Sequence, residues 1–128
     1  FLEQVIDART AWVNFLYRSS EPDEEFIPKY RPTLANIDTY LANRTWFGAE
    51  LSYVDFLAWE FFDHIALVFP KMLNENENIM KFYKRFANLP KIFAYIETDE
   101  FQTAACYGPA ARYAGSLVKI KRGEKMYY

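Results

Sequence analysis

Few residues in this 128-residue chain are of types that carry out chemistry by themselves. His64 is the only histidine and Cys106 the only cysteine, so neither has a companion of its own kind for a metal site. Asp63 and His64 are adjacent, and neighbouring positions on a helix point in different directions, so they make no metal pair. We interpret His64 as a capping or packing residue and Cys106 as a buried or inert thiol. The residues alone therefore predict no metal centre and no nucleophile.

Other charged residues allow more than one interpretation. Arg9 interrupts an apolar helical stripe, and a charge in that position needs a partner. An interface and an internal ion pair both remain open for it. Asp7 stands two residues earlier, where a helix carboxylate is most often solvated. The remaining acids of note lie in expected loops and are interpreted as solvated (Glu24, Glu25, Glu75, Glu77).

The stretch "LSYVDF" predicts a helix start. With Ser52 at the N-cap, its hydroxyl can accept from the amide of Asp55, whose carboxylate can reach back to the amide of Ser52. This is a capping box, with Leu51 and Phe56 at the two positions of a hydrophobic staple. Such a cap is worth about 1 kcal/mol. These four residues are assigned a structural role, because a buried helix start cannot rely on water for its free N–H groups.

The elements that position these residues are predicted from apolar residues spaced three and four apart. The first helix spans Leu2 to Leu16, and the run "SSEPDEEFIPKYRP" at 19–32 is predicted to be a loop. A second helix is expected over about 31–43, with Pro32 in its first turn.

The central helix is expected over 52–69, ending at Pro70, and it is apolar on most sides, as the middle helix of a bundle would be. "NENEN" is predicted as a polar linker. Two further helices follow, one around 79–86 and a short one opened by Pro90. No strand alternation is visible, so the fold class predicted is an all-α bundle of about five helices.

Composition limits the function. The length suits one domain, and a net charge of −2 does not point to nucleic acid. No apolar run is long enough for a membrane span, and a single cysteine fits a reducing, cytoplasmic location. The chain does not begin with Met, which suggests a fragment. From about residue 108 a basic tail is expected to be irregular, either solvent-exposed or a docking segment (Lys119, Lys121, Arg122, Lys125).

A longer context carries a family resemblance. The stretch "YLANRTWFGAELSYVDFLAWEFFDH" resembles the C-terminal domain of cytosolic glutathione transferases, most closely the mu class, where a Trp-Phe pair precedes a Ser/Thr-x-x-Asp capped central helix. The stretch "FYKRFANLPKIFAYIETDEF" is similar to the last helices of that family. The resemblance covers roughly residues 2 to 101. The loop after Trp46 and Phe47 is one residue short of the pattern, and the tail after Phe101 does not match.

The resemblance implies a helical domain over 1–107, an irregular tail over 108–128, and an N-terminal thioredoxin-like domain that is absent from this chain. That missing domain would bind glutathione, the co-substrate, and supply the residue that activates its thiol. No catalytic residue is therefore expected here. Neither a metal nor any other cofactor is implied. The parent enzyme would join glutathione to small electrophilic substrates.

Three residues take roles by resemblance. "VIDAR" matches the place of an aspartate that reaches the glutathione of the neighbouring subunit, so Asp7 is the candidate. Tyr17 matches a tyrosine of the electrophile pocket, although it could also be part of the core rim. Arg9 falls near the dimer axis. The resemblance thus implies a homodimer. The alternative is a non-catalytic, transferase-like domain used for binding or in a larger assembly; a free-standing ligand-binding domain fits less well.

Overall fold

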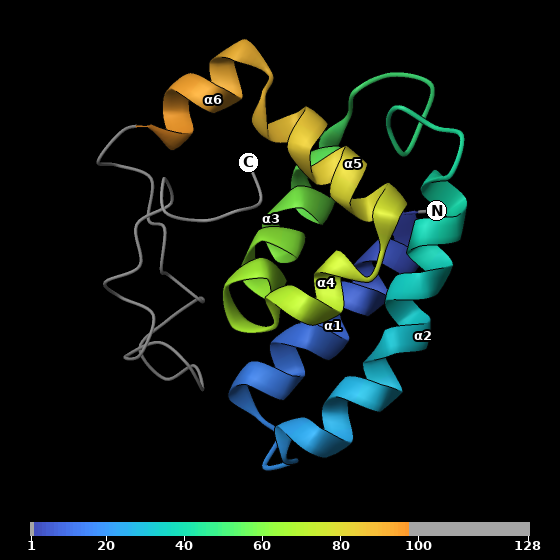
Figure 1. Ribbon diagram of the computed structural model, residues 1–128, viewed down its shortest axis with the longest axis vertical. Coiled ribbons are helices and arrows are strands. Elements are labelled where there is room, and N and C mark those ends of the chain that lie inside the picture. The colour runs from blue at the N-terminus through green and yellow to red at the C-terminus, as the bar shows by residue number, and fades with distance from the viewer. Residues whose placement is uncertain (1, 98–128) are drawn as a thin grey trace.

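In the computed structural model, residues 2–97 are described, and they form six α-helices and no strand. The all-α fold class is confirmed (Figure 1). The predictions for the tail at 108–128 and for Cys106 fall outside the described residues. The helices are α1 (Leu2–Tyr17), α2 (Asp23–Leu41), α3 (Tyr53–Val68), α4 (Pro70–Asn74), α5 (Glu77–Ala87) and α6 (Pro90–Ile96).

The helices pack around α3. In Figure 1, α1 and α2 lie side by side and are joined at the lower end of the view. Helix α3 packs against α1, α4 and α5, and α2 packs against α5. Helix α6 follows α5 at the upper end of the view and contacts it. Within residues 2–97, no helix has both the length and the apolar character needed to cross a membrane.

Aromatic side chains fill the core. Trp12 of α1 is fully buried, with the rings of Phe15, Phe26, Tyr30 and Phe69 at about 6 Å. Each large apolar side chain buried in this way contributes roughly 1.5–3 kcal/mol. The largest fully buried aromatics come from α1, α3 and α5, so α3 is the middle element, as its sequence predicts (Trp12, Phe15, Phe61, Phe62, Phe82, Tyr83, Phe86).

The prediction that 19–32 is a loop was wrong for most of that stretch. Helix α2 begins at Asp23, and both Pro28 and Pro32 lie inside it. Pro32 is therefore not in the first turn. Acids occupy the first turn of α2, where they interact favourably with the positive end of the helix dipole. That contribution alone does not offset two internal prolines, each of which removes a helical hydrogen bond.

Packing against α1 supplies the rest of the stability of this helix start. The ring of Phe26 stacks on Phe15 with centroids 3.8 Å apart. Tyr30 is buried, and its hydroxyl donates a 2.6 Å hydrogen bond to the carbonyl oxygen of Ala8. A proline inside a helix loses one hydrogen bond and clashes with the preceding turn, at a cost of about 3 kcal/mol, and the burial of two aromatic rings offsets much of this.

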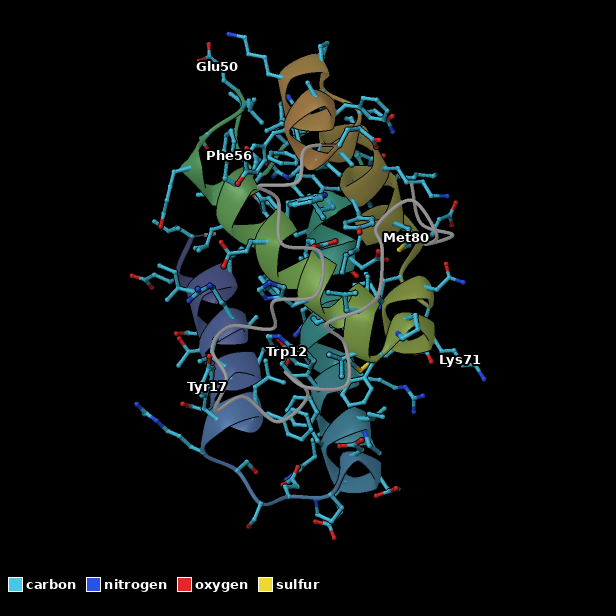
Figure 2. The ribbon with its side chains drawn as sticks, turned by 90° about the vertical axis from the view of Figure 1, so that its left-hand side faces the viewer. Trp12, Tyr17, Glu50, Phe56, Lys71 and Met80 are labelled. Atoms are coloured by element: carbon cyan, nitrogen blue, oxygen red, sulfur yellow. The ribbon has the colours of Figure 1, made fainter. Side chains whose placement is uncertain are left out.

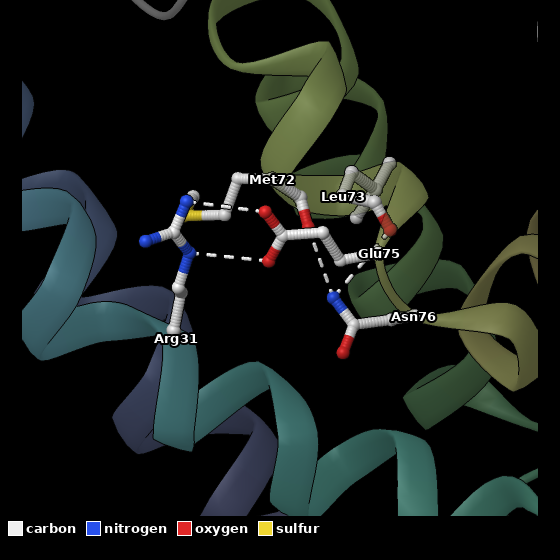
Figure 3. Close-up of polar contacts among 5 residues, drawn as sticks. All are labelled: Arg31, Met72, Leu73, Glu75 and Asn76. Carbon is white, nitrogen blue, oxygen red and sulfur yellow. Dashed lines mark hydrogen bonds and ion pairs between the residues drawn. The ribbon is translucent and has the colours of Figure 1, made fainter.

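The segment after Pro70 also differs from prediction. Pro70 does follow the end of the central helix, but it opens the short helix α4, so that residues 2–97 contain six helices where about five were predicted. "NENEN" is not a free linker, because Glu77 already begins α5. Figure 3 shows Arg31 of α2 paired with Glu75 through two 3.1 Å bonds, and Asn76 Nδ2 donating to the Met72 carbonyl at 3.0 Å.

A side chain from α2 also caps α5. The amide of Ile79, at the start of α5, donates a 2.8 Å hydrogen bond to Oδ1 of Asp38, and Asn78 Nδ2 donates to Oδ2 at 3.3 Å. A carboxylate at a helix N-terminus satisfies a free N–H and matches the helix dipole. The polar stretch around residue 76 therefore fastens α4 and α5 to α2.

Candidate functional site

Asp55 ties the central helix to the loop before it. The carboxylate is fully buried, and its Oδ2 accepts a 2.8 Å hydrogen bond from the amide of Ser52. Its Oδ1 accepts a second hydrogen bond, at 2.9 Å, from the amide of Phe47. One side chain thus serves two backbone donors from different segments. Hydrogen bonds to a charged acceptor are the stronger kind, so this contact orients the start of α3.

Ser52 stands at the N-cap of α3, with extended backbone, and forms the capping box with Asp55. In this capping box the contact from the Ser52 side chain is the weaker one. The amide of Asp55 makes its 3.0 Å hydrogen bond to the carbonyl oxygen of Ser52, not to the hydroxyl. The serine hydroxyl lies 3.5 Å from Asp55 Oδ2. Leu51 and Phe56, at the staple positions, are 40% and 45% exposed, and the Phe56 ring packs edge-on against Phe86 at 4.9 Å.

The Trp46–Phe47 segment is held from several sides. The hydroxyl of Tyr40 donates a 2.7 Å hydrogen bond to the carbonyl oxygen of Phe47, whose amide is bound by Asp55. The Trp46 ring packs edge-on against Phe82 at 6.1 Å. Phe47 therefore anchors the loop between α2 and α3, because both its backbone amide and its carbonyl oxygen are hydrogen-bonded.

Asp7 lies at an open hollow between α1 and α2. The hollow has a volume of about 440 Å³, and Asp7 is the one charged residue in its lining. The side chain of Asp7 is exposed, which leaves the carboxylate accessible to a group from outside the domain. The lining of the hollow combines the Asp7 carboxylate with amide, hydroxyl and apolar side chains (Gln4, Asp7, Ala8, Ala11, Thr33, Asn36, Ile37).

Arg9 points away from that hollow. Its Nη2 lies 3.3 Å from Oε1 of Glu60 on α3, with the two side chains 32% and 50% exposed. Each residue turns the helix by about 100°. Asp7 and Arg9 are two residues apart, so their side chains leave α1 on nearly opposite sides. The structure contains the internal ion pair, and the role of Arg9 at an interface stays a prediction.

Tyr17 is the last residue of α1 and is 37% exposed. In Figure 2 it lies at the end of α1 opposite the end near Phe56 and α6. Arg9, Val13 and Tyr17 follow each other at intervals of four residues, each step turning by about 40°. They therefore form one continuous strip along α1, with Tyr17 accessible at its end.

A buried polar pair within α3 and α5 was missed by the sequence interpretation. Asp63 is 3% exposed, and the hydroxyl of Tyr83 donates a 2.6 Å hydrogen bond to its Oδ1. The indole Nε1 of Trp59 donates to the carbonyl oxygen of Tyr83 at 3.1 Å. The sequence did contain a signal for this pair. Asp63 is an acid inside the apolar central helix, and a buried carboxylate needs a hydrogen-bond donor. From the sequence alone, Asp63 is assessed only as a possible metal partner of His64, which is half-buried in the structure.

Residues 2–97 hold no group of three or more His, Cys, Asp or Glu side chains arranged to bind a metal ion. Within residues 2–97, the polar side chains bind backbone groups, bind side chains of a neighbouring helix, or face solvent. What the arrangement offers chemically is an exposed carboxylate, Asp7, and an exposed phenol, Tyr17, presented by one rigid helix. An exposed carboxylate can accept hydrogen bonds from a ligand, and an exposed phenol can donate one.

These features define an all-helical domain whose capped central helix supports a first helix carrying accessible polar groups. A family model described as "Glutathione S-transferase, C-terminal domain" matches residues 6–99. The chain therefore belongs to the glutathione S-transferase C-terminal domain family, and the resemblance seen in the sequence is confirmed.

Relatives of the mu class support the same assignment. The chain is 36% identical to glutathione S-transferase Mu 3 of Macaca fuscata fuscata and 35% identical to that of Homo sapiens, in each case over 103 residues covering 77% of this chain and 45% of the relative. The crystal structure of the glutathione S-transferase Blo t 8 is similar with a TM-score of 0.68 and 31% identity, covering 87% of this chain and 56% of that one. The chain spans about half the length of these relatives.

Proposed function

We propose that this chain is the electrophile-binding and dimerisation domain of a mu-like glutathione transferase that works in the cytoplasm. The observation that supports the proposal is the exposure of Asp7 and Tyr17 on α1, in a chain that belongs to this family; their correspondence to the family's ligand-binding positions comes from the sequence resemblance. The two side chains are both exposed, which a role toward ligands requires.

In this proposal the thiol-activating group comes from a thioredoxin-like domain outside this chain. That domain binds glutathione, the co-substrate, and favours its thiolate. No metal or further cofactor is needed. The helical domain then holds the electrophile close to the sulfur, and holding two reactants in the productive geometry lowers the barrier substantially.

Tyr17 has the role of a hydrogen-bond donor to the electrophile. When the thiolate adds to an electrophilic carbon, negative charge develops on the substrate, and a phenol donor placed there stabilises the transition state more than the ground state. Its position at the exposed end of the strip formed with Arg9 and Val13 supports this role, because a substrate can reach it from solvent.

Asp7 has the role of contacting the glutathione of the neighbouring subunit across a two-fold axis. Its exposed carboxylate beside an open hollow supports this, because a cationic or N–H-bearing group can approach it. A symmetric interface uses the same patch twice, so each subunit would donate one Asp7. Arg9, which the resemblance puts near the dimer axis, would contribute to this homodimer from α1, where it also pairs with Glu60 of α3.

The test compares the full-length parent with the isolated chain in a conjugation assay with glutathione and an aryl chloride. The full-length protein is expected to release chloride and form the thioether, whereas the 128-residue chain should stay at the background rate. Turnover by the isolated chain would show that the active site is misplaced. An inactive but well-folded full-length protein would favour the other candidate, a non-catalytic binding or assembly domain.

A further inference from the structure

One sequence pattern occurs twice in the chain, and the structure uses only one copy as a helix cap. A serine or threonine with an acid three residues later is found at Ser20 ("SEPD") and Ser52 ("SYVD"), and at no other position of the sequence. At Ser52 the pattern is the capping box of α3, and its acid, Asp55, is fully buried. Capping thus explains the pattern at Ser52 and leaves Ser20 without that explanation.

Ser20 stands outside the helix that follows it. Helix α2 begins at Asp23 with Pro22 as its N-cap, and no side-chain hydrogen bond caps it. Ser20 is exposed, and its hydroxyl makes no hydrogen bond to any part of residues 2–97. The hydroxyl of Ser19 differs, because it accepts a 3.0 Å hydrogen bond from the amide of Glu21. Ser20 therefore presents an accessible alcohol that the described part of the fold does not use.

The residues after Ser20 carry a pattern of negative charge. Acids stand one, three, four and five positions after the serine (Glu21, Asp23, Glu24, Glu25). Glu24 and Glu25 are exposed in the first turn of α2. Protein kinases select their substrates partly through charge patterns, and the basic groups of an acid-directed kinase can bind carboxylates that follow the target serine. After Ser52, by contrast, the only acid within five residues is the buried Asp55.

The segment that holds Ser20 can open without disturbing the core. A substrate serine has to enter the cleft of the kinase, which a firmly held first turn of α2 would hinder. Pro28 has no N–H, so the carbonyl oxygen of Glu24 cannot accept the usual helical hydrogen bond from residue 28. The first buried side chain of α2 is Phe26. Residues 20–25 can therefore separate at low free energy, as helix ends do, while Phe26 stays packed.

We propose that Ser20 is a phosphorylation site for a serine/threonine kinase that recognises acidic residues after its target. The γ-phosphoryl group of ATP moves to Oγ of Ser20. The bond between the γ-phosphorus and the bridging oxygen breaks, and its electron pair leaves with ADP. The new Oγ–P bond forms, and the hydroxyl proton passes to the base of the kinase. This site is independent of the proposed function, because it does not require glutathione conjugation.

The experiment incubates the full-length protein with casein kinase II and ATP, and mass spectrometry of tryptic peptides locates the phosphate. Cleavage after Arg18 and Lys29 releases residues 19–29, whereas Ser52 lies in a separate peptide that begins at Thr45. Fragment ions distinguish Ser20 from its neighbour. We expect phosphate on Ser20 and none above background on Ser52. A synthetic peptide of residues 15–29 serves as the reference for the same segment without the fold.

Variants separate the target from its recognition. Ser20→Ala should abolish the phosphate on the 19–29 peptide, and Ser19→Ala, the matched control, should leave it unchanged. Asp23→Asn should lower the kcat/KM of the kinase about tenfold, since it removes a charged contact with the enzyme. Glu50→Gln is the control for charge, because Glu50 is an exposed acid outside this segment. Circular dichroism checks that each variant is folded.

Phosphate on Ser20 of the folded protein, at a rate within about tenfold of the rate for the peptide, would support the proposal, since opening one helix end costs little. Phosphate on the peptide but not on the folded protein would overturn it, because the fold would then withhold the serine. Absence of phosphate from both would also overturn it, and so would an unchanged kcat/KM in Asp23→Asn. A parent that fails to conjugate glutathione would overturn the proposed function alone.

Discussion

The carboxylate of Asp55 binds the amide of Phe47 at 2.9 Å while it also binds the amide of Ser52 at 2.8 Å. The contact to Ser52 is local and closes the helix cap, but the contact to Phe47 crosses eight residues and fixes the loop that precedes the helix. Because Phe47 is buried, its amide cannot turn to water if the carboxylate is lost, whereas Ser52 is exposed and its hydrogen bond to Asp55 is only part-buried. Asp55 therefore supports the position of the central helix and of every side chain that depends on it.

Asp55→Ala is expected to lower the free energy of unfolding by about 3 kcal/mol, because the buried N–H of Phe47 and the part-buried N–H of Ser52 both lose a charged acceptor. Ser52→Ala should cost only about 1 kcal/mol, as an ordinary N-cap loss. Urea unfolding followed by circular dichroism measures both. Glu24→Gln, in the exposed first turn of α2, serves as the control. Equal costs for the two replacements would show that the Phe47 contact is unimportant.

Tyr83→Phe should destabilise the domain by about 2 kcal/mol, since it leaves one oxygen of the buried Asp63 without its 2.6 Å donor. A double-mutant cycle with Asp63→Ala measures the coupling between the two residues. We expect a coupling energy of at least about 1 kcal/mol, the range for contacting residues of one hydrogen-bond network. Additive effects of the two changes would contradict a direct interaction.

The Arg31–Glu75 pair should matter much less, despite its two 3.1 Å bonds (Figure 3). Both side chains are about half exposed, so Glu75→Gln is expected to cost less than about 1 kcal/mol. The stability lost in Glu75→Gln should be smaller still in 1 M salt, where charges are screened within about 3 Å. Thermal unfolding at low and high salt is the measurement. A large loss that persists in salt would be inconsistent with this estimate.

Tyr17→Phe in the full-length protein is expected to slow addition of glutathione to an α,β-unsaturated ketone. Losing one donor to developing charge costs up to about 3 kcal/mol, roughly 10²-fold in kcat. The KM for glutathione should stay nearly the same, because the phenol faces the electrophile. Tyr53→Phe is the control, since Tyr53 is 71% exposed on α3. An unchanged rate with chemistry rate-limiting would exclude Tyr17 from the site.

Asp7→Asn in the full-length protein should raise the KM for glutathione about fivefold, corresponding to about 1 kcal/mol for an exposed ionic contact. The effect should vanish under conditions where sedimentation shows only monomer, because in the proposed dimer the contact crosses the two-fold axis. Glu24→Gln again provides an exposed acid for comparison. An equal rise in monomer and dimer would place the contact of Asp7 within its own subunit.

Local signals in the sequence determined the central part of the fold. Ser52 and Asp55 mark the start of α3, and Pro70 follows its end, because caps and prolines act on neighbouring residues whatever the rest of the chain does. The start of α6 at Pro90 is determined in the same way. The apolar spacing within each helix also indicated which face is buried, and hence the all-α class.

Tertiary structure alone decided where α2 begins and which polar groups meet. The stretch at 19–32 contains enough proline to read as a loop, and only packing of Phe26 and Tyr30 against α1 makes it helical from Asp23. The long-range pairs were equally hidden (Phe47–Asp55, Asp63–Tyr83, Arg9–Glu60, Asp38–Ile79). A helix signal involves residues within about one turn, whereas the partner of a side chain depends on how all the helices pack around one core.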